Sequence, residues 1–214
     1  MNKFGALLFT SVFLAAGASA ATLAVNCSVG SGPTELNANV SCPQFSLTGL
    51  SSVQITVSGN IQGTITLTNN AATTQIVNAT VSSQFNVGPL AGFTFANPLF
   101  TASYGTGSRS LISNQTVTFA GLLGNGSGSL GTNTTVLAPY VGGSTFNINI
   151  STLSGISILG GGGQIGSNQS TLAQGTALVT YTYNESGVIP EPATMSMLGF
   201  GLLALAFASR RFKK

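Results

Sequence analysis

The sequence predicts an all-β fold: an antiparallel β-sandwich ectodomain that lies between an N-terminal signal peptide and a C-terminal transmembrane helix. Three observations lead to this prediction. Apolar and polar residues alternate in several runs in the middle of the chain, no segment there repeats apolar residues with a helical period, and each end carries a short apolar run next to basic residues. We therefore expect three parts, at residues 1–20, 21–187 and 188–214.

The expected strands are the runs in which every second residue is apolar. They are residues 53–57, 61–67, 77–87, 117–119, 146–150 and 179–183, and they are rich in β-branched side chains. Stretches rich in Gly, Ser and Asn separate them, and residues 105–113, 124–135 and 160–166 are expected to be loops. Because no helical segment connects the strands, we expect two antiparallel sheets packed face to face. A β-helix is the alternative fold, and the lack of a fixed repeat of roughly 20–30 residues argues against it.

The first 20 residues have the three parts of a secretory signal peptide. Lys3 supplies the positive charge, residues 4–17 are the apolar stretch, and Ala18, Ser19 and Ala20 are the small residues that precede a cleavage site. Signal peptidase is therefore expected to cut between Ala20 and Ala21. The alternative is an uncleaved membrane anchor, for which the apolar stretch is short.

Residues 188–214 combine a rigid motif, an apolar run and a basic end. Pro190, Glu191 and Pro192 come first, and the two prolines favour an extended, accessible backbone. The apolar run at about 193–208 is near the lower length limit for a helix that crosses a bilayer. The four cations that follow would stay on the cytoplasmic side, and they are Arg210, Arg211, Lys213 and Lys214. The alternative is a buried core helix, which an abrupt basic end does not favour.

This segment, VIPEPATMSMLGFGLLALAFASRRFKK, resembles the PEP-CTERM sorting signal, which membrane proteases called exosortases process in Gram-negative bacteria. The resemblance implies export, a transient inner-membrane anchor, cleavage near Pro190-Glu191-Pro192, and delivery to the cell surface or an exopolysaccharide matrix. A second resemblance covers residues 45–85 and 177–186, which are similar to the choice-of-anchor E domain. It implies a β-rich exported module to which no catalytic residues can be assigned.

The predicted ectodomain is almost free of charge. Arg109, Glu35 and Glu185 are its only charged residues, so residues 21–187 carry one positive and two negative charges, a net charge of −1. A nucleic-acid partner is not expected, because binding to phosphate backbones requires clustered Lys and Arg. Cys27 and Cys42 are fifteen residues apart, and export favours a disulfide between them. No metal or other cofactor is expected, because no histidine or aspartate could complete a ligand set.

The predicted ectodomain offers little that could catalyse a reaction. Without histidine, a Ser-His-Asp triad cannot form, and the only carboxylate pair is Glu35 and Glu185 in turn-like segments. We expect no catalytic residue. Tyr104 and Tyr140 lie in loop-like segments and are the candidate glycan contacts, with packing in the core as the alternative.

The sequence therefore predicts a non-enzymatic, exported protein of the cell surface or extracellular matrix, which associates through polar, uncharged sheet faces. The alternative function is a carbohydrate-binding module or adhesin attached to exopolysaccharide, and an enzyme ranks third. Nine Asn-x-Ser/Thr sequons occur, among them those at Asn78 and Asn149. They indicate either glycosylation or simply the polar faces of strands.

Overall fold

The computed structural model describes residues 20–184, 196–203 and 205. Contacts divide the chain into two units. One unit is Ala21–Asn184, and the other consists of Met1–Ala20 with Glu185–Lys214. Most of the predicted signal peptide lies outside the described residues, and the predicted cleavage point after Ala20 falls at the start of the first strand.

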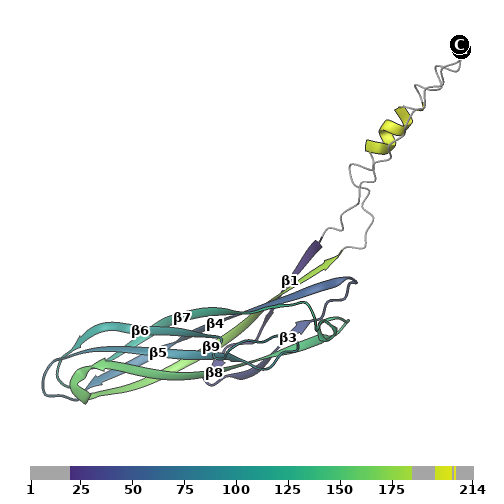
Figure 1. Cartoon of the computed structure of the whole chain (residues 1–214). Helices are drawn as coiled ribbons and strands as arrows, with labels where there is room; N and C mark the ends of the chain where they lie inside the picture. Colours follow the sequence, from purple (N-terminus) through teal and green to yellow (C-terminus); the bar gives the residue numbers. More distant parts are fainter. Residues whose placement is uncertain (1–19, 185–195, 204, 206–214) are drawn as a thin grey trace, which may run out of the picture. The chain divides into compact units, whose positions relative to one another are not determined.

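Two antiparallel sheets form the larger unit, and they pack as two layers of an elongated sandwich (Figure 1). Sheet I has the order β1 (Ala20–Ser28), β9 (Ile165–Asn184), β4 (Leu50–Asn69) and β7 (Thr116–Asn133), and the short β2 (Gly32–Pro33) also pairs with β9. Sheet II has the order β3 (Asn37–Pro43), β8 (Thr145–Gly160), β5 (Gln75–Val87) and β6 (Phe100–Leu111). Two short 3-10 helices, η1 (Ala138–Tyr140) and η2 (Gly161–Gly163), lie between strands. The predicted sandwich is confirmed, and the alternative β-helix is wrong.

The chain passes from one sheet to the other at most of its turns. From β3 onward, only β5 and β6 are neighbours both along the chain and within one sheet. This connectivity places β1 and β3 at one lateral edge of the sandwich, and β7 and β6 at the other. We call these the disulfide edge and the glycine edge, for the reasons given below.

The alternating pattern predicts correctly which side chains face the core. Val53, Ile55 and Val57 are fully buried, and so are Ile61, Ile65 and Leu67. The two runs predicted as separate strands, 53–57 and 61–67, belong to the single 20-residue strand β4. The β-branched side chains of these strands fill the space between the sheets, and burial of this apolar surface is the main force that holds the sandwich together.

Two of the three predicted loops are wrong, because glycine in this chain also serves inside strands. Most of 105–113 belongs to β6, and most of 124–135 belongs to β7. A Cβ atom built on Gly126 would lie 2.7 Å from Phe100 Cδ2, and one built on Gly128 would lie 2.7 Å from Leu99 Cγ. These glycines allow β7 to approach β6 and the segment before it closely. Residues 160–166 include a true connection, where Gly161–Gly163 all have positive φ.

A disulfide between Cys27 and Cys42 joins β1 of sheet I to β3 of sheet II, as the sequence predicts. The two Cα atoms are 5.4 Å apart. The bond therefore closes the edge of the sandwich opposite the glycine-rich strand β7.

Asn69, fully buried at the end of β4, is hydrogen-bonded to the turn between β6 and β7. Its side-chain amide nitrogen donates hydrogen bonds to the carbonyl oxygens of Thr73, Leu111 and Ile112, at 2.9–3.0 Å. Leu111 ends β6 and Ile112 begins the connection to β7, so one amide joins the β4–β5 turn to the β6–β7 turn. Buried carbonyl groups without such a partner would be costly.

Candidate functional site

Tyr104 and Tyr140, the predicted glycan contacts, are packed inside the domain, so this prediction is wrong. Tyr104 lies in strand β6 with 5% of its surface exposed, and its hydroxyl is 2.6 Å from Thr171 Oγ1 of β9. Tyr140 is 1% exposed, and its hydroxyl donates to the carbonyl oxygen of Ala91 at 2.6 Å. Burial raises the pKa of both phenols. Neither ring has a free face on which a sugar could stack.

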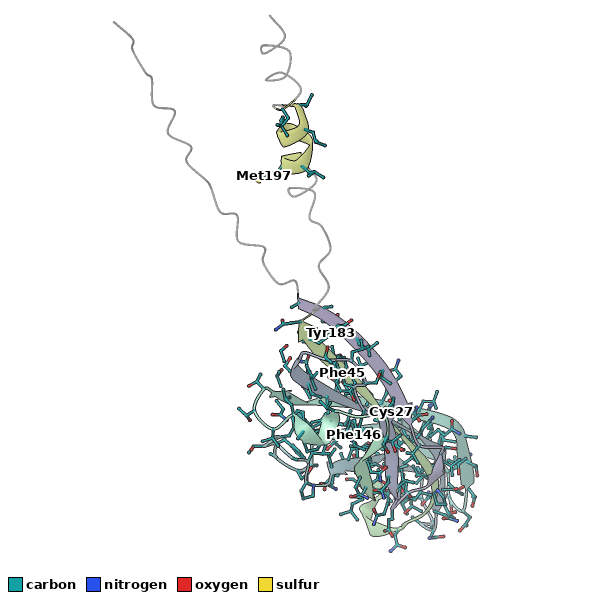
Figure 2. All side chains as sticks on the ribbon, turned by 90° about the vertical axis from the view of Figure 1, so that its right-hand side faces the viewer. Cys27, Phe45, Phe146, Tyr183 and Met197 are labelled. Atoms are coloured by element: carbon teal, nitrogen blue, oxygen red, sulfur yellow. A yellow bond between two sulfur atoms is a disulfide. The ribbon has the colours of Figure 1, made fainter. Side chains whose placement is uncertain are left out.

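Other aromatic rings also pack within the sandwich. The ring of Phe45 lies 5.0 Å from that of Tyr183, and both residues are labelled in Figure 2. The ring of Tyr181 lies 5.5 Å from that of Phe45. The Tyr181 hydroxyl donates to the carbonyl oxygen of Pro43 at 2.6 Å, and burial raises the pKa of Tyr181 to about 12. Tyr140 meets Phe146 edge-on with centroids 4.9 Å apart. Such contacts stabilise the fold and leave the search for a binding site to the outer faces of the sheets.

On sheet I, a row of three glycines crosses the strands. Gly59 of β4 is paired with Gly126 of β7 on one side and with Gly175 of β9 on the other. Side chains of sheet II occupy the space where Cβ atoms would be: the ring of Phe85 under Gly59, Phe100 under Gly126, and Ile150 under Gly175. Phe85 and Phe100 are stacked, with ring centroids 4.7 Å apart. The row is therefore required for packing between the sheets.

The residues on either side of each glycine point outward and line an open depression of about 430 Å³. We call it the polar trough. Its lining side chains form two rows across β7, β4 and β9: Asn125, Asn60 and Gln174 in one, and Ser127, Ser58 and Thr176 in the other. Because alternate residues of a strand lie about 7 Å apart along it, the two rows stand on opposite sides of the glycine row.

The polar trough contains hydrogen-bonding groups and no charge. Each side-chain amide of the trough has N–H donors and a carbonyl acceptor, and each hydroxyl can donate or accept a hydrogen bond. Asn60 Nδ2 lies 3.5 Å from Gln174 Oε1, whereas the side chains of Asn125 and Ser127 make no hydrogen bond within the described part of the chain. Glu35 and Arg109 are the acidic and basic side chains among residues 20–184, and neither lines the trough. The site can bind an uncharged polar ligand through side-chain hydrogen bonds.

The sequence-based prediction of Tyr104 and Tyr140 rested on aromatic residues, and none lines the polar trough. A usable signal was present in three strand segments, each with a glycine between two polar residues: Ser58-Gly59-Asn60, Asn125-Gly126-Ser127 and Gln174-Gly175-Thr176. What the sequence could not supply was the register that brings the three segments side by side.

Catalytic and metal-binding groups are sparse in the described residues. Glu35 lies in a turn with φ of 74°, and Glu185, the other member of the only predicted carboxylate pair, lies outside the described residues. In residues 20–184, 196–203 and 205, no group of three His, Cys, Asp or Glu side chains could hold a metal ion.

The predicted sorting residues Pro190, Glu191 and Pro192, and the basic residues Arg210, Arg211, Lys213 and Lys214, also lie outside the described residues. Between them, residues 196–203 and 205 are helical. The apolar side chains of this helix are exposed, as in Figure 2 for Met197, and the others are Leu198, Phe200, Leu202, Leu203 and Leu205. In the described part of the chain, no helix has the length and apolar character needed to span a membrane, so the predicted transmembrane helix stays a prediction.

Comparison with solved structures gives only weak likenesses. A viral particle of infectious bursal disease virus is 9% identical with a TM-score of 0.17, and the match covers 88% of this chain and 47% of that one. A mutant VP2 protein of the same virus is 10% identical with a TM-score of 0.16, over 78% of this chain and 37% of that one. This chain thus spans half or less of the length of these proteins. At these TM-scores the likeness bears on neither fold nor function.

Comparison with protein families is informative for residues 188–211, which match the PEP-CTERM protein-sorting motif. No curated protein matches the chain. The resemblance of the body to the choice-of-anchor E domain therefore stays a prediction. The matched motif implies export and membrane-associated sorting by an exosortase, as the Pro-Glu-Pro, apolar and basic segments predict. Residues 188–211 are thus a PEP-CTERM protein-sorting motif, and the chain is a protein that carries this export and sorting signal.

Proposed function

We propose that this protein is a non-enzymatic component of the cell surface or extracellular matrix. In this proposal the chain is exported, held for a time by residues 193–208 in the inner membrane, and released when an exosortase-type protease cuts near Pro190-Glu191-Pro192. The match of residues 188–211 to the sorting motif carries the proposal. The disulfide supports it as well, because such bonds persist in oxidising compartments outside the cytoplasm.

The nearly uncharged body supports a role in association rather than in chemistry. General acid–base and nucleophilic catalysis need ionisable groups held together in a site. Residues 20–184 contain Glu35 and Arg109 on different strands or turns, together with tyrosines that are largely packed in the core. Low net charge also gives little repulsion between copies, which suits a matrix component.

The sorting step can be tested with the intact mass of the protein in membrane and medium fractions of the producing cells. We expect the wild-type protein in the medium to lack residues 1–20 and to end near Pro190. In a Glu191→Gln/Pro192→Ala variant, we expect the chain to accumulate in the membrane with its basic end still attached. Glu35→Gln is the matched control, because it also removes one carboxylate but leaves the motif intact. Release of the double variant with the wild-type mass, or a full-length wild-type chain in the cytosol, would contradict the proposal.

A further inference from the structure

The polar trough on sheet I has the form of a binding site for a linear polymer. Its two rows of side chains run across three strands, which lie about 4.8 Å apart in a sheet. At the β7 end no further strand of sheet I blocks it, because β7 is the edge strand. A chain-like ligand could therefore lie along the row of glycines and continue past the edge of the sheet.

The hydrogen-bonding groups of the trough match those of sugars. Asn60, Asn125 and Gln174 each present an amide that both donates and accepts, as sugar hydroxyl groups also do. The side chains of Asn125, Ser127 and Ser58 make no hydrogen bond to other described residues, so binding through these three would not break an existing bond. Asn60 Nδ2 lies 3.5 Å from Gln174 Oε1, and this long hydrogen bond is the one that a ligand on Asn60 would replace. Side-chain amides and hydroxyls in two facing rows can bond to hydroxyls on both sides of one sugar chain.

Apolar residues next to the trough could contact the C–H faces of a sugar. The row beyond Asn125, Asn60 and Gln174 contains Leu123 and Leu172, paired on either side of Gln62. Leu123 is 70% exposed and Leu172 is 37% exposed. Exposed leucines beside hydrogen-bonding groups suit a ligand that has C–H faces as well as hydroxyls.

The lack of charge selects among possible ligands. A site for phosphate or for an acidic polymer would need Arg or Lys, and none lines the trough. An extended peptide would be expected at an unpaired strand edge, where backbone groups are free, rather than over the paired strands β4 and β9. A protein partner would be expected to bury a larger apolar centre.

From these observations we propose that the polar trough binds a neutral polysaccharide. This goes beyond the proposed sorting and surface role, because binding would be a property of the folded body and would not depend on exosortase processing. It replaces Tyr104 and Tyr140 with Asn60 and Asn125 as the principal candidate contacts.

The test is affinity electrophoresis of the full chain, purified in mild detergent, through gels that contain a neutral polymer. The probes are laminarin, galactomannan, hydroxyethyl cellulose and dextran, and alginate is the acidic comparison. We expect the wild-type chain to be retarded by at least one neutral probe, with little change on adding salt. We expect Asn60→Ala/Asn125→Ala to bind about tenfold or more weakly, the effect of losing one or two hydrogen bonds.

The matched control is Gln54→Ala/Thr132→Ala. These two residues are also exposed on the outer face of β4 and β7 and are paired with each other, but they lie outside the trough. We expect this control to bind like the wild type. Ser58→Ala/Ser127→Ala tests the opposite row independently, and thermal melting confirms that each variant is folded.

Three outcomes would overturn the proposal. One is that no neutral polymer retards the wild-type chain, and another is that only alginate does. The third is that the Asn60→Ala/Asn125→Ala variant binds the neutral polymer as the wild type does. If that variant also loses self-association in sedimentation, the trough would be assigned to a second copy of the chain. None of these results would alter the sorting proposal, which is measured by the mass of the chain in cell fractions.

Discussion

The two lateral edges of the sandwich are closed by different physical means. At the disulfide edge, the bond between Cys27 and Cys42 joins β1 of sheet I to β3 of sheet II. At the glycine edge, β7 lies so close to β6 that a Cβ atom on Gly124 would overlap the backbone of Ser103. The first edge depends on an oxidising compartment and the second does not. We therefore expect the oxidising compartment to affect the closure of the disulfide edge and to leave that of the glycine edge unchanged.

The largest expected effect comes from removing the disulfide. A Cys27→Ala/Cys42→Ala variant should lose about 3 kcal/mol of unfolding free energy, because the bond closes a loop of fifteen residues and restricts the unfolded chain. Urea denaturation under oxidising conditions measures this loss. A reductant should lower the stability of the wild type to that of the variant and should leave the variant unchanged.

Hydrogen exchange of the same variant would show whether the two edges are independent. We expect faster exchange in β1 and β3, and unchanged exchange in β6 and β7, because no covalent bond acts at the glycine edge. Equal acceleration at both edges would contradict the comparison. It would mean that the sandwich opens as one unit.

A smaller effect is expected when the glycine edge is overpacked. Gly124→Val should cost about 2 kcal/mol, since its side chain would meet the backbone of Ser103 and would force β7 away from β6. Gly155→Val in β8 is the matched control, because nothing lies within 4 Å of a Cβ atom at that position. Differential scanning calorimetry of the two variants gives the comparison. Equal melting temperatures would show that close approach at Gly124 is not required.

The same glycines explain which parts of the fold could be predicted from the sequence. Alternation of apolar and polar residues correctly placed the side chains of Ile55, Ile65 and Val81 in the core, because that pattern reflects burial directly. The disulfide followed from Cys27 and Cys42 being the only cysteines. Residues 124–135 were predicted to be a loop, because glycine usually marks turns, although most of them belong to β7. The local sequence does not record that a second sheet lies against this strand.

The candidate site was less predictable than the fold, for a related reason. Asn60, Asn125 and Gln174 are far apart in the sequence, and only the register of β7, β4 and β9 makes them one row. Tyr104 and Tyr140 were singled out by residue type alone. Their burial depends on Thr171 and Ala91, which bind the two hydroxyl groups and are distant in the chain.

The smallest expected effect on stability comes from Tyr181, which is hydrogen-bonded to β3 at the disulfide edge. The Tyr181 hydroxyl donates to the carbonyl oxygen of Pro43, next to Cys42, and so ties β9 of sheet I to β3 of sheet II. Burial, with a smaller contribution from Tyr140, raises the pKa of Tyr181 to about 12. An unfolded tyrosine has a pKa of about 10, so the unfolded state loses its proton first as the pH rises. Stability from this group is therefore complete below pH 10 or so and falls between about pH 10 and 12.

Urea midpoints measured from pH 8 to pH 11.5 should show this fall in the wild type and a shallower one in Tyr181→Phe. At pH 8 the variant should lose about 1 kcal/mol, the usual net contribution of one hydrogen bond. Combined with Cys27→Ala/Cys42→Ala, its effect should be non-additive, because Pro43 adjoins Cys42 and both contacts hold the same strand. Tyr104 lies in β6 at the glycine edge, and its hydroxyl is hydrogen-bonded to Thr171. The loss of unfolding free energy in Tyr104→Phe should therefore simply add to the loss in the cysteine variant. If Tyr181→Phe and Tyr104→Phe were equally non-additive with the cysteine variant in unfolding free energy, the two edges would not be energetically independent.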